Sequence, residues 1–309
     1  MTEPGSPSGV VEDEQVTVVV ASRNRRDELL RSLGRHRAPV VYVDNCSTDG
    51  SADAVEEHYP AVEVVRLPRN EGAYGRTLGV ARVHTPLVAF ADDDSWWAPG
   101  SLAAAARAFR DHPRLGLVNA RILVGPEERL DPTCAEMARS PLPRPPGLPG
   151  APLLGFIACG AMVRTAAFRE VGGFDPVVRF PGEEERLALD LADRGWHLSY
   201  LDDVVVHHHP SPHRGSADHR NRGTARSRVL TGALRLPAGD ALARTGRLLA
   251  AGPVQRDGVR DAVRDLPAAL RMRRVLSDRV AAQAEMLRTA PVDPRPPAAE
   301  AGHRRGGRR

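Results

Sequence analysis

The sequence predicts an α/β fold: a mostly parallel, twisted sheet flanked by helices, followed by a C-terminal helical extension. Short β-branched runs alternate with helical segments along the first two thirds of the chain, as in sheets covered by helices on both faces. The first runs are continuously apolar rather than alternating, which is typical of parallel strands buried on both faces. Polar side chains follow these runs, at the strand ends where such sheets bind ligands.

The expected strands are short and apolar, beginning with VTVVVA, and the helices between them carry apolar residues at helical spacing. Strands are expected at residues 16–21, 40–43, 62–67, 87–91, 115–124 and 204–206. Helices are expected at residues 27–33, 52–58, 72–83, 100–112 and 184–194. Residues 125–152 are rich in proline and show no periodic pattern. A loop of that length is usually a functional flap or a disordered segment.

Charge divides the chain near residue 212. All 43 basic residues are arginine, which excludes a Walker A loop, a Schiff-base enzyme and the usual protein-kinase site, since each needs a lysine. Residues 1–212 carry 22 arginines and 30 acidic residues, a balance of −8, whereas residues 213–309 carry 21 and 9, a balance of +12. We therefore expect the chemistry in the acidic part. The basic part can bind an anionic surface or partner, or present solvated helix faces.

Composition also predicts the domain organisation. The segments are a leader at 1–14, an α/β domain at 15–212, a basic helical extension at 213–288 and a tail at 289–309. The leader and the tail have too little apolar content to fold and are expected to be disordered. Prolines divide the extension into three or four amphipathic helices. The N-terminus lacks the pattern of a secretory signal and no apolar run is long enough to span a membrane, so we expect a cytoplasmic protein.

Three adjacent aspartates, Asp92, Asp93 and Asp94, follow directly on an apolar strand. Adjacent carboxylates repel one another and lower stability unless cations offset the repulsion. Carboxylate oxygens suit hard ions such as Mg²⁺ or Mn²⁺, which bind one or two of them together with substrate phosphates. The triplet therefore predicts a divalent-metal site, and an acidic turn without a ligand is the alternative.

The order of the motifs resembles that of the inverting family 2 glycosyltransferases, which have the Rossmann-like GT-A fold. The resemblance runs from residue 16 to about residue 211 and depends on VVVASRNR, VDNCSTDGS, RNEGAYGRTLGVA, ADDD, GGFDP with EEERLALDLADRGW, and VVVHHHPS. Each motif alone is weak, but their joint order and spacing are specific. The resemblance implies transfer of a sugar from a nucleotide-diphospho-sugar to an acceptor hydroxyl, with Mn²⁺ or Mg²⁺ as cofactor.

By this resemblance, the ends of the first strands bind the nucleotide. Asp44 matches the carboxylate that reads the nucleotide base. Ser22 and Arg23 lie where the end of the first strand contacts the nucleotide, and Arg76 lies in a segment that lines the same pocket. Ordinary turn or helix-cap chemistry is the alternative for each of these residues.

The same resemblance assigns the metal ligands. Asp92 and Asp94 match the ends of the DxD motif, with Asp92 and Asp93 near the ribose and Asp94 the first candidate for the metal. A histidine often follows the last strand of the family as a further metal or diphosphate contact. Alternation along a strand makes His207 and His209 point together, so His207 is the first choice and His209 the second. Surface histidines without a ligand are the alternative.

Glu184 and Glu183 are the candidates on the acceptor side. They occupy the place of the family's Glu-Asp pair, whose second carboxylate is the general base, and Glu184 aligns with that position. The acid at this position is Glu rather than Asp, so Glu183 remains a second candidate for the base. For both residues the alternative is an acidic helix N-terminus without a catalytic role. Trp96 and Trp97 offer a platform for a sugar or acceptor ring, although core packing explains at least one of them.

The resemblance therefore implies one in-line displacement with inversion, in the synthesis of a cell-surface glycan, polysaccharide or glycolipid. The expected acceptor is a glycan or a lipid-linked sugar. The basic charge balance and amphipathic spacing of residues 213–288 predict a peripheral contact with an anionic membrane from its cytoplasmic face, and no nucleic acid is expected. One alternative is a sugar nucleotidyltransferase, but ASRNRRDE lacks the glycines and the lysine of such an enzyme's phosphate loop. Another is a catalytically inactive GT-A binding protein, against which the intact carboxylates argue.

Overall fold

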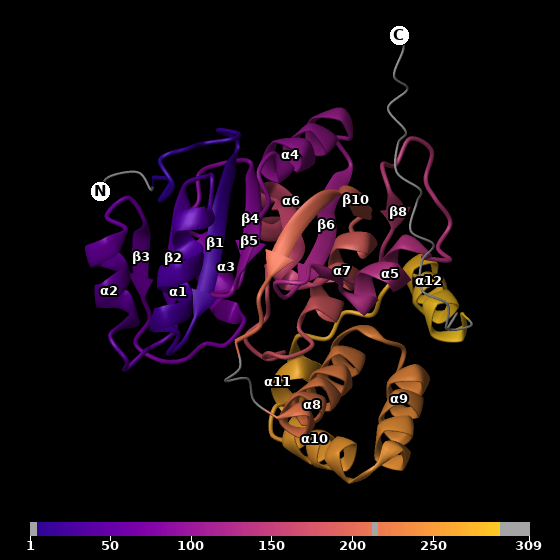
Figure 1. Ribbon diagram of the computed structural model, residues 1–309. Coiled ribbons are helices and arrows are strands. Elements are labelled where there is room, and N and C mark those ends of the chain that lie inside the picture. Colours follow the sequence, from indigo (N-terminus) through magenta and orange to yellow (C-terminus); the bar gives the residue numbers. More distant parts are fainter. Residues whose placement is uncertain (1–4, 212–215, 291–309) are drawn as a thin grey trace.

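The computed structural model describes residues 5–211 and 216–290 (Figure 1). One mixed sheet forms the centre of the molecule; helices α8 to α11 form a lobe beneath it in this view, and the last helix, α12, lies beside α5. The strand order is β3-β2-β1-β4-β9-β6-β10-β5, with β7 beside β6 and β8 beside β10. The predicted α/β fold with a C-terminal helical region is confirmed.

The sheet combines a parallel part with antiparallel additions. Its strands are β1 Val16–Ser22, β2 Val40–Asp44, β3 Glu63–Arg66, β4 Leu87–Ala91, β5 Ser95–Trp97, β6 Leu115–Val124, β7 Arg129–Leu130, β8 Ala151–Pro152, β9 Ala161–Arg164 and β10 His197–His208. Strands β1 to β4 pair in parallel, as do β6 and β10. Strand β9 lies antiparallel between β4 and β6. The parallel strands β1, β2 and β4 are buried almost throughout, as their continuous hydrophobicity predicts.

Helices pack against the sheet and form the extension. They are α1 Arg26–Ser32, α2 Ser51–His58, α3 Tyr74–Val80, α4 Ser101–Asp111, α5 Pro132–Ala138, α6 Thr165–Glu170, α7 Glu184–Asp193, α8 Ala217–Arg235, α9 Ala238–Ala251, α10 Pro253–Val263, α11 Leu266–Arg271 and α12 Asp278–Thr289, with short 3₁₀ turns at Leu33–Arg35 and Ala158–Gly160. No helix within the described ranges has both the length and the apolar content to cross a bilayer.

Strand β10 is longer than expected. The sequence predicts a strand at 204–206, but the structure begins it at His197, with a bulge between Leu201 and Val205. The two aspartates in the bulge interrupt the apolar run, while the backbone on both sides still pairs with β6. A bulge of this kind bends a strand without ending it, so side-chain pattern alone underestimates the strand.

The proline-rich stretch at 125–152 is partly ordered into helix, contrary to the expectation of a structureless segment. Asp131 caps α5, because its carboxylate accepts a hydrogen bond from the Thr133 N–H at 2.8 Å, and Pro132 takes the first helical position. Cys134 on this helix is fully buried, and its Sγ accepts a hydrogen bond from the Ile122 N–H. The stretch therefore packs onto the sheet domain.

The leader is likewise attached to the sheet domain over its described part. The Val40 N–H donates to the Gly5 carbonyl oxygen, the Glu12 N–H donates to Arg37, and Arg110 donates to Asp13 at 2.8 Å. Residues 5–14 are therefore ordered, contrary to expectation, because backbone hydrogen bonds and ion pairs with distant parts of the chain do not need apolar content. Residues 1–4 lie outside the described residues.

The described part of the extension, from residue 216 onward, contains five helices rather than three or four. Helices α8 to α11 bury a small core of their own, built on Leu230, Leu234 and Leu248. Helices α8 and α10 approach closely at Gly258, where an added Cβ would lie 2.3 Å from the Arg222 carbonyl oxygen. Prolines begin α10 and α11, as helix-starting prolines do, so they start helices as well as separate them. The expected disordered tail falls on 291–309, outside the described residues.

A buried charge cluster joins the extension to the sheet domain. Asp190 of α7 is 1% exposed and accepts hydrogen bonds from Arg186, from Arg235 of α8 and from Arg274. Burial alone would raise the pKa of Asp190, but the hydrogen bonds and charges of these arginines outweigh it and lower the pKa. Loss of the carboxylate would leave buried arginines unpaired, so this cluster holds the two regions together.

Candidate active site

The carboxyl ends of β1, β2 and β4 lie side by side at one edge of the sheet. Ser22 at the end of β1 is in register with Asp44 at the end of β2. On the other side of β1, Val20 is in register with Ala91, the residue before the aspartate triplet. The polar strand ends are therefore brought together at the edge where parallel sheets bind ligands.

Asp44 is a buried carboxylate with a defined orientation. Its Oδ1 accepts a hydrogen bond from the Tyr42 hydroxyl at 3.1 Å, and its Oδ2 accepts one from the Ser47 N–H at 3.2 Å. Arg23 is exposed beside it, and its Nε donates to the Cys46 carbonyl oxygen at 3.3 Å. A carboxylate accepts only, so Asp44 can recognise hydrogen-bond donors on a base.

The aspartate triplet concentrates negative charge. Burial, together with repulsion from Asp94 and Asp92, raises the pKa of Asp93 to about 8. The Asp93 carboxylate has an arginine nearby, with the Nε atom of Arg25 4.0 Å from Oδ1. Asp94 is 8% exposed, and its Oδ2 accepts a hydrogen bond from the Ser211 N–H at 3.1 Å. Carboxylates crowded in this way are stabilised by a bound cation.

Arg76 connects the triplet to the start of α7. Its Nη2 donates to Asp92 Oδ1 at 2.6 Å and its Nη1 donates to Glu183 Oε1 at 3.2 Å. The guanidinium is buried and lies 5.6 Å from the centre of the Phe174 ring. The resemblance expects Arg76 only beside the nucleotide, whereas the structure also makes it the link between the two acidic groups of the site.

Glu183 and Glu184 occupy different environments although they are neighbours. Glu183 is 1% exposed and paired with Arg76, and burial, with repulsion from Glu184, raises its pKa to about 8. Glu184 is half-buried and lines a cavity of about 830 Å³. Burial raises the pKa of Glu184 as well. A carboxylate with a raised pKa at a cavity wall is suited to accept a proton, and Glu184 has the access that Glu183 lacks.

Strand pairing decides which histidine faces the triplet. His207 and His209 do point to one side, as alternation predicts, but their rings pack on Trp96, at centroid distances of 5.5 and 4.8 Å. His208 points the other way, and its Nε2 lies 3.2 Å from Asp94 Oδ1. The reason is the register of β5 with β10, which sets Trp96 opposite His207 and leaves His208 on the side of the triplet.

The donor set near the triplet fits a hard or borderline divalent cation. Ligand atoms of Asp92, Cys159 and His208 lie within 4.8 Å of one another. Burial raises the pKa of the Cys159 thiol well above its usual range, and a protonated thiol is a poor ligand. The remaining carboxylates and imidazole match the oxygen and nitrogen ligands of Mn²⁺, and the carboxylates alone those of Mg²⁺.

The sequence does not by itself show which histidine faces the triplet or which of the two tryptophans packs in the core. His208 can be identified as the histidine beside the triplet only when SWW is known to be a strand paired with β10. That pairing determines which side of the sheet each histidine faces. The Trp97 side chain packs in the core with its Nε1 donating to the Phe90 carbonyl oxygen, while Trp96 lies beneath Arg35 and the two histidines. Arg35 and the two histidines therefore cover the Trp96 ring on which a sugar was expected to stack.

Comparison with known proteins identifies the family. Residues 17–172 match the family described as Glycosyl transferase family 2. The chain is 32% identical over 219 residues to the pre-mycofactocin glycosyltransferase of Mycobacterium tuberculosis, covering 67% of this chain and 45% of that protein. It is 28% identical over 212 residues to the N-acetylglucosaminyl-diphospho-decaprenol L-rhamnosyltransferase of the same organism, covering 57% of this chain and 68% of that one.

A solved structure shares the fold. The mannosyltransferase PcManGT from Pyrobaculum calidifontis, in complex with GDP-Man and Mn²⁺, superposes with a TM-score of 0.51 at 20% identity, covering 94% of this chain and 80% of that one. The chain spans about half the length of the first of its two M. tuberculosis relatives. The match to the family covers half of the chain and includes the strand ends, the aspartate triplet and Arg76. The chain therefore belongs to glycosyl transferase family 2 and has the GT-A fold.

Proposed function

We propose that this chain transfers a sugar from a nucleotide-diphospho-sugar to an acceptor hydroxyl, with inversion at the anomeric carbon. One observation carries the proposal. Arg76 donates hydrogen bonds both to Asp92, in the triplet that can hold a cation, and to Glu183, just before α7. The next residue, Glu184, lines a large cavity. A donor bound at the aspartate triplet and an acceptor bound in the cavity would therefore meet near Glu184.

The donor site is assigned to the ends of β1, β2 and β4. Asp44 is assigned to the base, Ser22 and Arg23 to the nucleotide, and Asp92 and Asp93 to the ribose. The mannosyltransferase with the same fold was solved with a nucleotide sugar and Mn²⁺, which supports a donor and a cation here.

The metal would be held by Asp94, with Asp92 as a second carboxylate. His208 is added to this assignment because it contacts Asp94, ahead of His207 and His209, whose rings lie on Trp96. A bound divalent cation would offset the charge of the leaving diphosphate as a Lewis acid.

The acceptor side is assigned to the cavity at Glu184. The Glu184 carboxylate accepts the proton of the acceptor hydroxyl while the oxygen attacks the anomeric carbon and the bond to the diphosphate breaks. Attack and departure on opposite faces invert the configuration, by the logic of other one-step displacements at sugars. Arg76 forms a buried ion pair with Glu183 and so fixes the residue next to this carboxylate.

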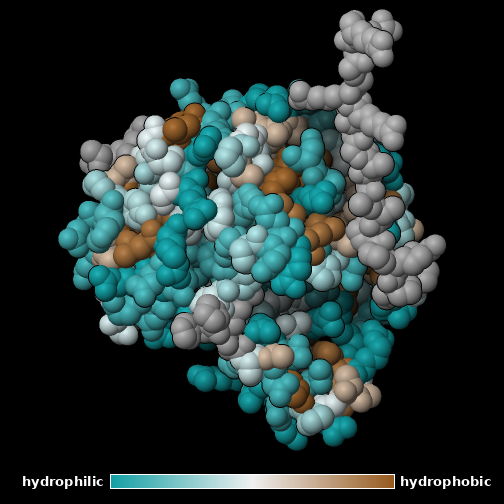
Figure 2. All heavy atoms as spheres, in the orientation of Figure 1, coloured by the Kyte–Doolittle hydropathy of each residue, from teal (hydrophilic) through white to brown (hydrophobic). Residues whose placement is uncertain are grey.

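The basic extension is proposed to contact an anionic membrane from its cytoplasmic face. Most of the large hydrophobic side chains that are exposed lie in residues 242–287, among them Leu242 at 73% and Val263 at 59%. Figure 2 shows apolar side chains among hydrophilic ones on this lobe. Arginines beside exposed apolar side chains favour binding to anionic lipid headgroups. Flotation with anionic liposomes is expected to be lost at high salt, and equal recovery with neutral liposomes would contradict this assignment.

A glycan or a lipid-linked sugar is the proposed acceptor, in the synthesis of a cell-surface glycan, polysaccharide or glycolipid. The rhamnosyltransferase relative is named for a diphospho-decaprenol acceptor, which supports the lipid-linked class. The remaining alternatives are a sugar nucleotidyltransferase and an inactive GT-A binding protein. The products distinguish them: a nucleotidyltransferase joins a nucleotide to a sugar phosphate, and an inactive binding protein turns over no donor.

A panel of nucleotide sugars, with and without Mn²⁺, tests the proposal. A true donor is expected to raise the melting temperature only when Mn²⁺ is present, because binding to the native state alone stabilises it. The same donor is then expected to be hydrolysed slowly without an acceptor. The Asp94→Ala variant should lose both effects, and full cation-dependent binding and transfer in that variant would refute the assigned site.

A further inference from the structure

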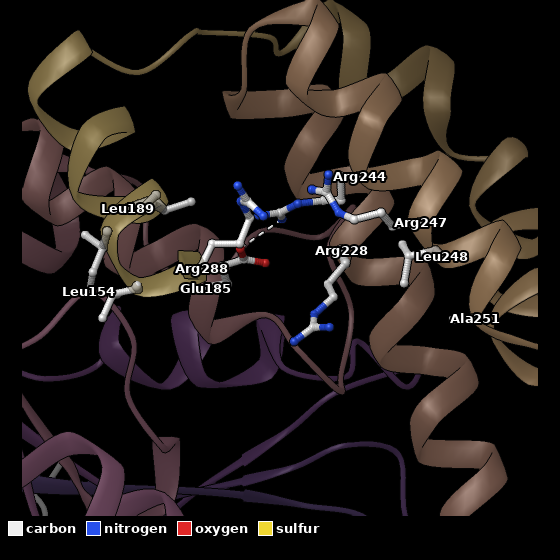
Figure 3. Close-up of a pocket in the computed structure, with 11 residues that line it drawn as sticks. Leu154, Glu185, Leu189, Arg228, Arg244, Arg247, Leu248, Ala251 and Arg288 are labelled. Carbon is white, nitrogen blue, oxygen red and sulfur yellow. Dashed lines mark ion pairs between the residues drawn. The ribbon is translucent and has the colours of Figure 1, made fainter. Parts of the chain in front are cut away.

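A second pocket, of about 510 Å³, lies between the sheet domain and the helical extension (Figure 3). Its walls come from helices α7, α8, α9 and α12 and from the segment before residue 155. Four arginines line it: Arg228, Arg244, Arg247 and Arg288. Glu185 is the one acidic residue among its lining residues, so the lining carries a net charge of +3.

The arginines of this pocket differ in how they are paired. Arg244 Nη1 lies 2.9 Å from Glu185 Oε1, and Arg288 Nε donates to Glu285 at 2.6 Å. In the described part of the chain, no carboxylate lies within 4 Å of Arg228 or Arg247. In Figure 3 the Arg247 side chain extends toward those of Arg244 and Arg288, and the Arg228 side chain extends away from them along another part of the pocket. A guanidinium group that no carboxylate contacts directly is available for an anion from outside.

The pocket adjoins the cavity at Glu184. Leu154, Glu185, Arg228 and Leu287 line both spaces. Since Glu184 and Glu185 are consecutive residues at the start of α7, the proposed base and the arginine pocket are separated by little more than one residue. Leucines complete the walls, with Leu189 and Leu248 on opposite sides of the arginines. A ligand that fills both spaces would have a polar end, a strong negative charge and an apolar part.

We infer that the Arg228–Arg247 pocket binds the phosphate or diphosphate group of the acceptor while its hydroxyl lies at Glu184. This inference depends on the proposed function for the position of the hydroxyl. A guanidinium matches the oxygens of a phosphate in a bidentate manner. Once Glu285, which pairs with Arg288, is counted beside Glu185, the charge balance around the pocket is still +2. The group is carried either by a lipid-linked sugar, whose chain would follow the leucines, or by a water-soluble phosphorylated sugar.

Titration calorimetry of the full chain in EDTA tests the inference, with farnesyl diphosphate, inorganic pyrophosphate and farnesol as probes. EDTA removes the cation that the donor site needs. Farnesyl diphosphate is expected to bind, and the Arg228→Gln/Arg247→Gln variant to bind it at least about tenfold more weakly, because two charge-assisted contacts are lost. The control is Arg264→Gln/Arg271→Gln, which removes two exposed arginines of the same extension away from the pocket and should bind as the parent does.

Two further comparisons separate this inference from the proposed function. Asp94→Ala should lose Mn²⁺-dependent donor binding and keep farnesyl diphosphate binding, whereas the pocket variant should do the reverse. Tighter binding of farnesyl diphosphate than of pyrophosphate would identify a lipid-linked source, and equal binding a water-soluble one. Equal affinity of parent and pocket variant for farnesyl diphosphate, or binding of farnesol as tight as that of farnesyl diphosphate, would overturn the inference even if donor binding behaves as proposed.

Discussion

The sheet domain and the helical extension concentrate charges of opposite sign. In the sheet domain, buried β-branched strands carry acidic residues at their ends, and the carboxylates of Asp92, Asp93 and Asp94 crowd together. In the extension, short helices with a small core present arginines to solvent and to a pocket. The first arrangement suits a cation and a donor, the second an anion. Two half-sites of opposite sign therefore meet at the start of α7, on either side of Glu184.

The largest expected effect tests the chemistry on the acidic side. Glu184→Gln removes the proposed base without changing its size, and transfer should fall about 10²- to 10⁴-fold, with cation-dependent thermal stabilisation by the donor unchanged. The raised pKa of Glu184 also predicts that the rate in the parent rises with pH above the usual range of a glutamate, since only the ionised form accepts a proton.

The transfer rate is measured as a function of pH, and a second glutamate of the same cavity provides the control. Glu136 lines the same cavity but has no assigned role, so Glu136→Gln should retain most of the activity. If Glu183→Gln rather than Glu184→Gln abolished transfer while the fold was kept, the base would be the buried residue and the cavity would lose its role.

The next effect tests the junction between the two regions. Asp190→Asn leaves Arg235 and Arg186 without a counter-charge in a buried site, and the free energy of unfolding should fall by about 3–5 kcal/mol, measured by urea denaturation. Because the folded pKa of Asp190 is lowered, its contribution is full above the unfolded value of about 3.9 and is lost as pH falls through the folded pKa. The difference between parent and variant should therefore shrink in acid. Asp257→Asn, at an exposed pair on α10, should change stability little.

A smaller effect tests the packing of the extension alone. Gly258→Ala places a methyl group against the backbone of α8, so the free energy of unfolding should fall by about 1–3 kcal/mol, while donor binding persists below the melting temperature. Gly246→Ala in α9 has open space around it and should be neutral or stabilising by up to about 1 kcal/mol. Equal stability of the two variants would show that α8 and α10 do not pack as described.

The smallest effect distinguishes the histidines. His208→Ala should raise the Mn²⁺ concentration needed for half-maximal activity about tenfold, because the imidazole beside Asp94 is lost. His207→Ala should leave that concentration unchanged, since its ring lies on Trp96. The reverse result would restore the assignment that strand alternation alone suggests.

The sequence by itself determined the α/β class, the order of the first strands and helices, and the acidic strand ends. These depend on residues close together in the chain, since a buried strand needs an apolar run and a turn follows it directly. The motif order from VVVASRNR to VVVHHHPS also led to the correct family. The sequence also identified Glu183 and Glu184 as the candidate bases, but it could not show that Glu184 lines a cavity.

Only the tertiary structure decided which of three consecutive histidines faces Asp94, because the register with β5 sets the side of each residue. It also decided that residues 5–14 and the proline-rich stretch are packed, since their contacts are made with distant backbone groups and side chains. The arginine pocket is a third case, because α8, α9 and α12 are brought together only by folding. Composition shows that a segment is basic, but the direction of each guanidinium depends on neighbours that are far away in the sequence.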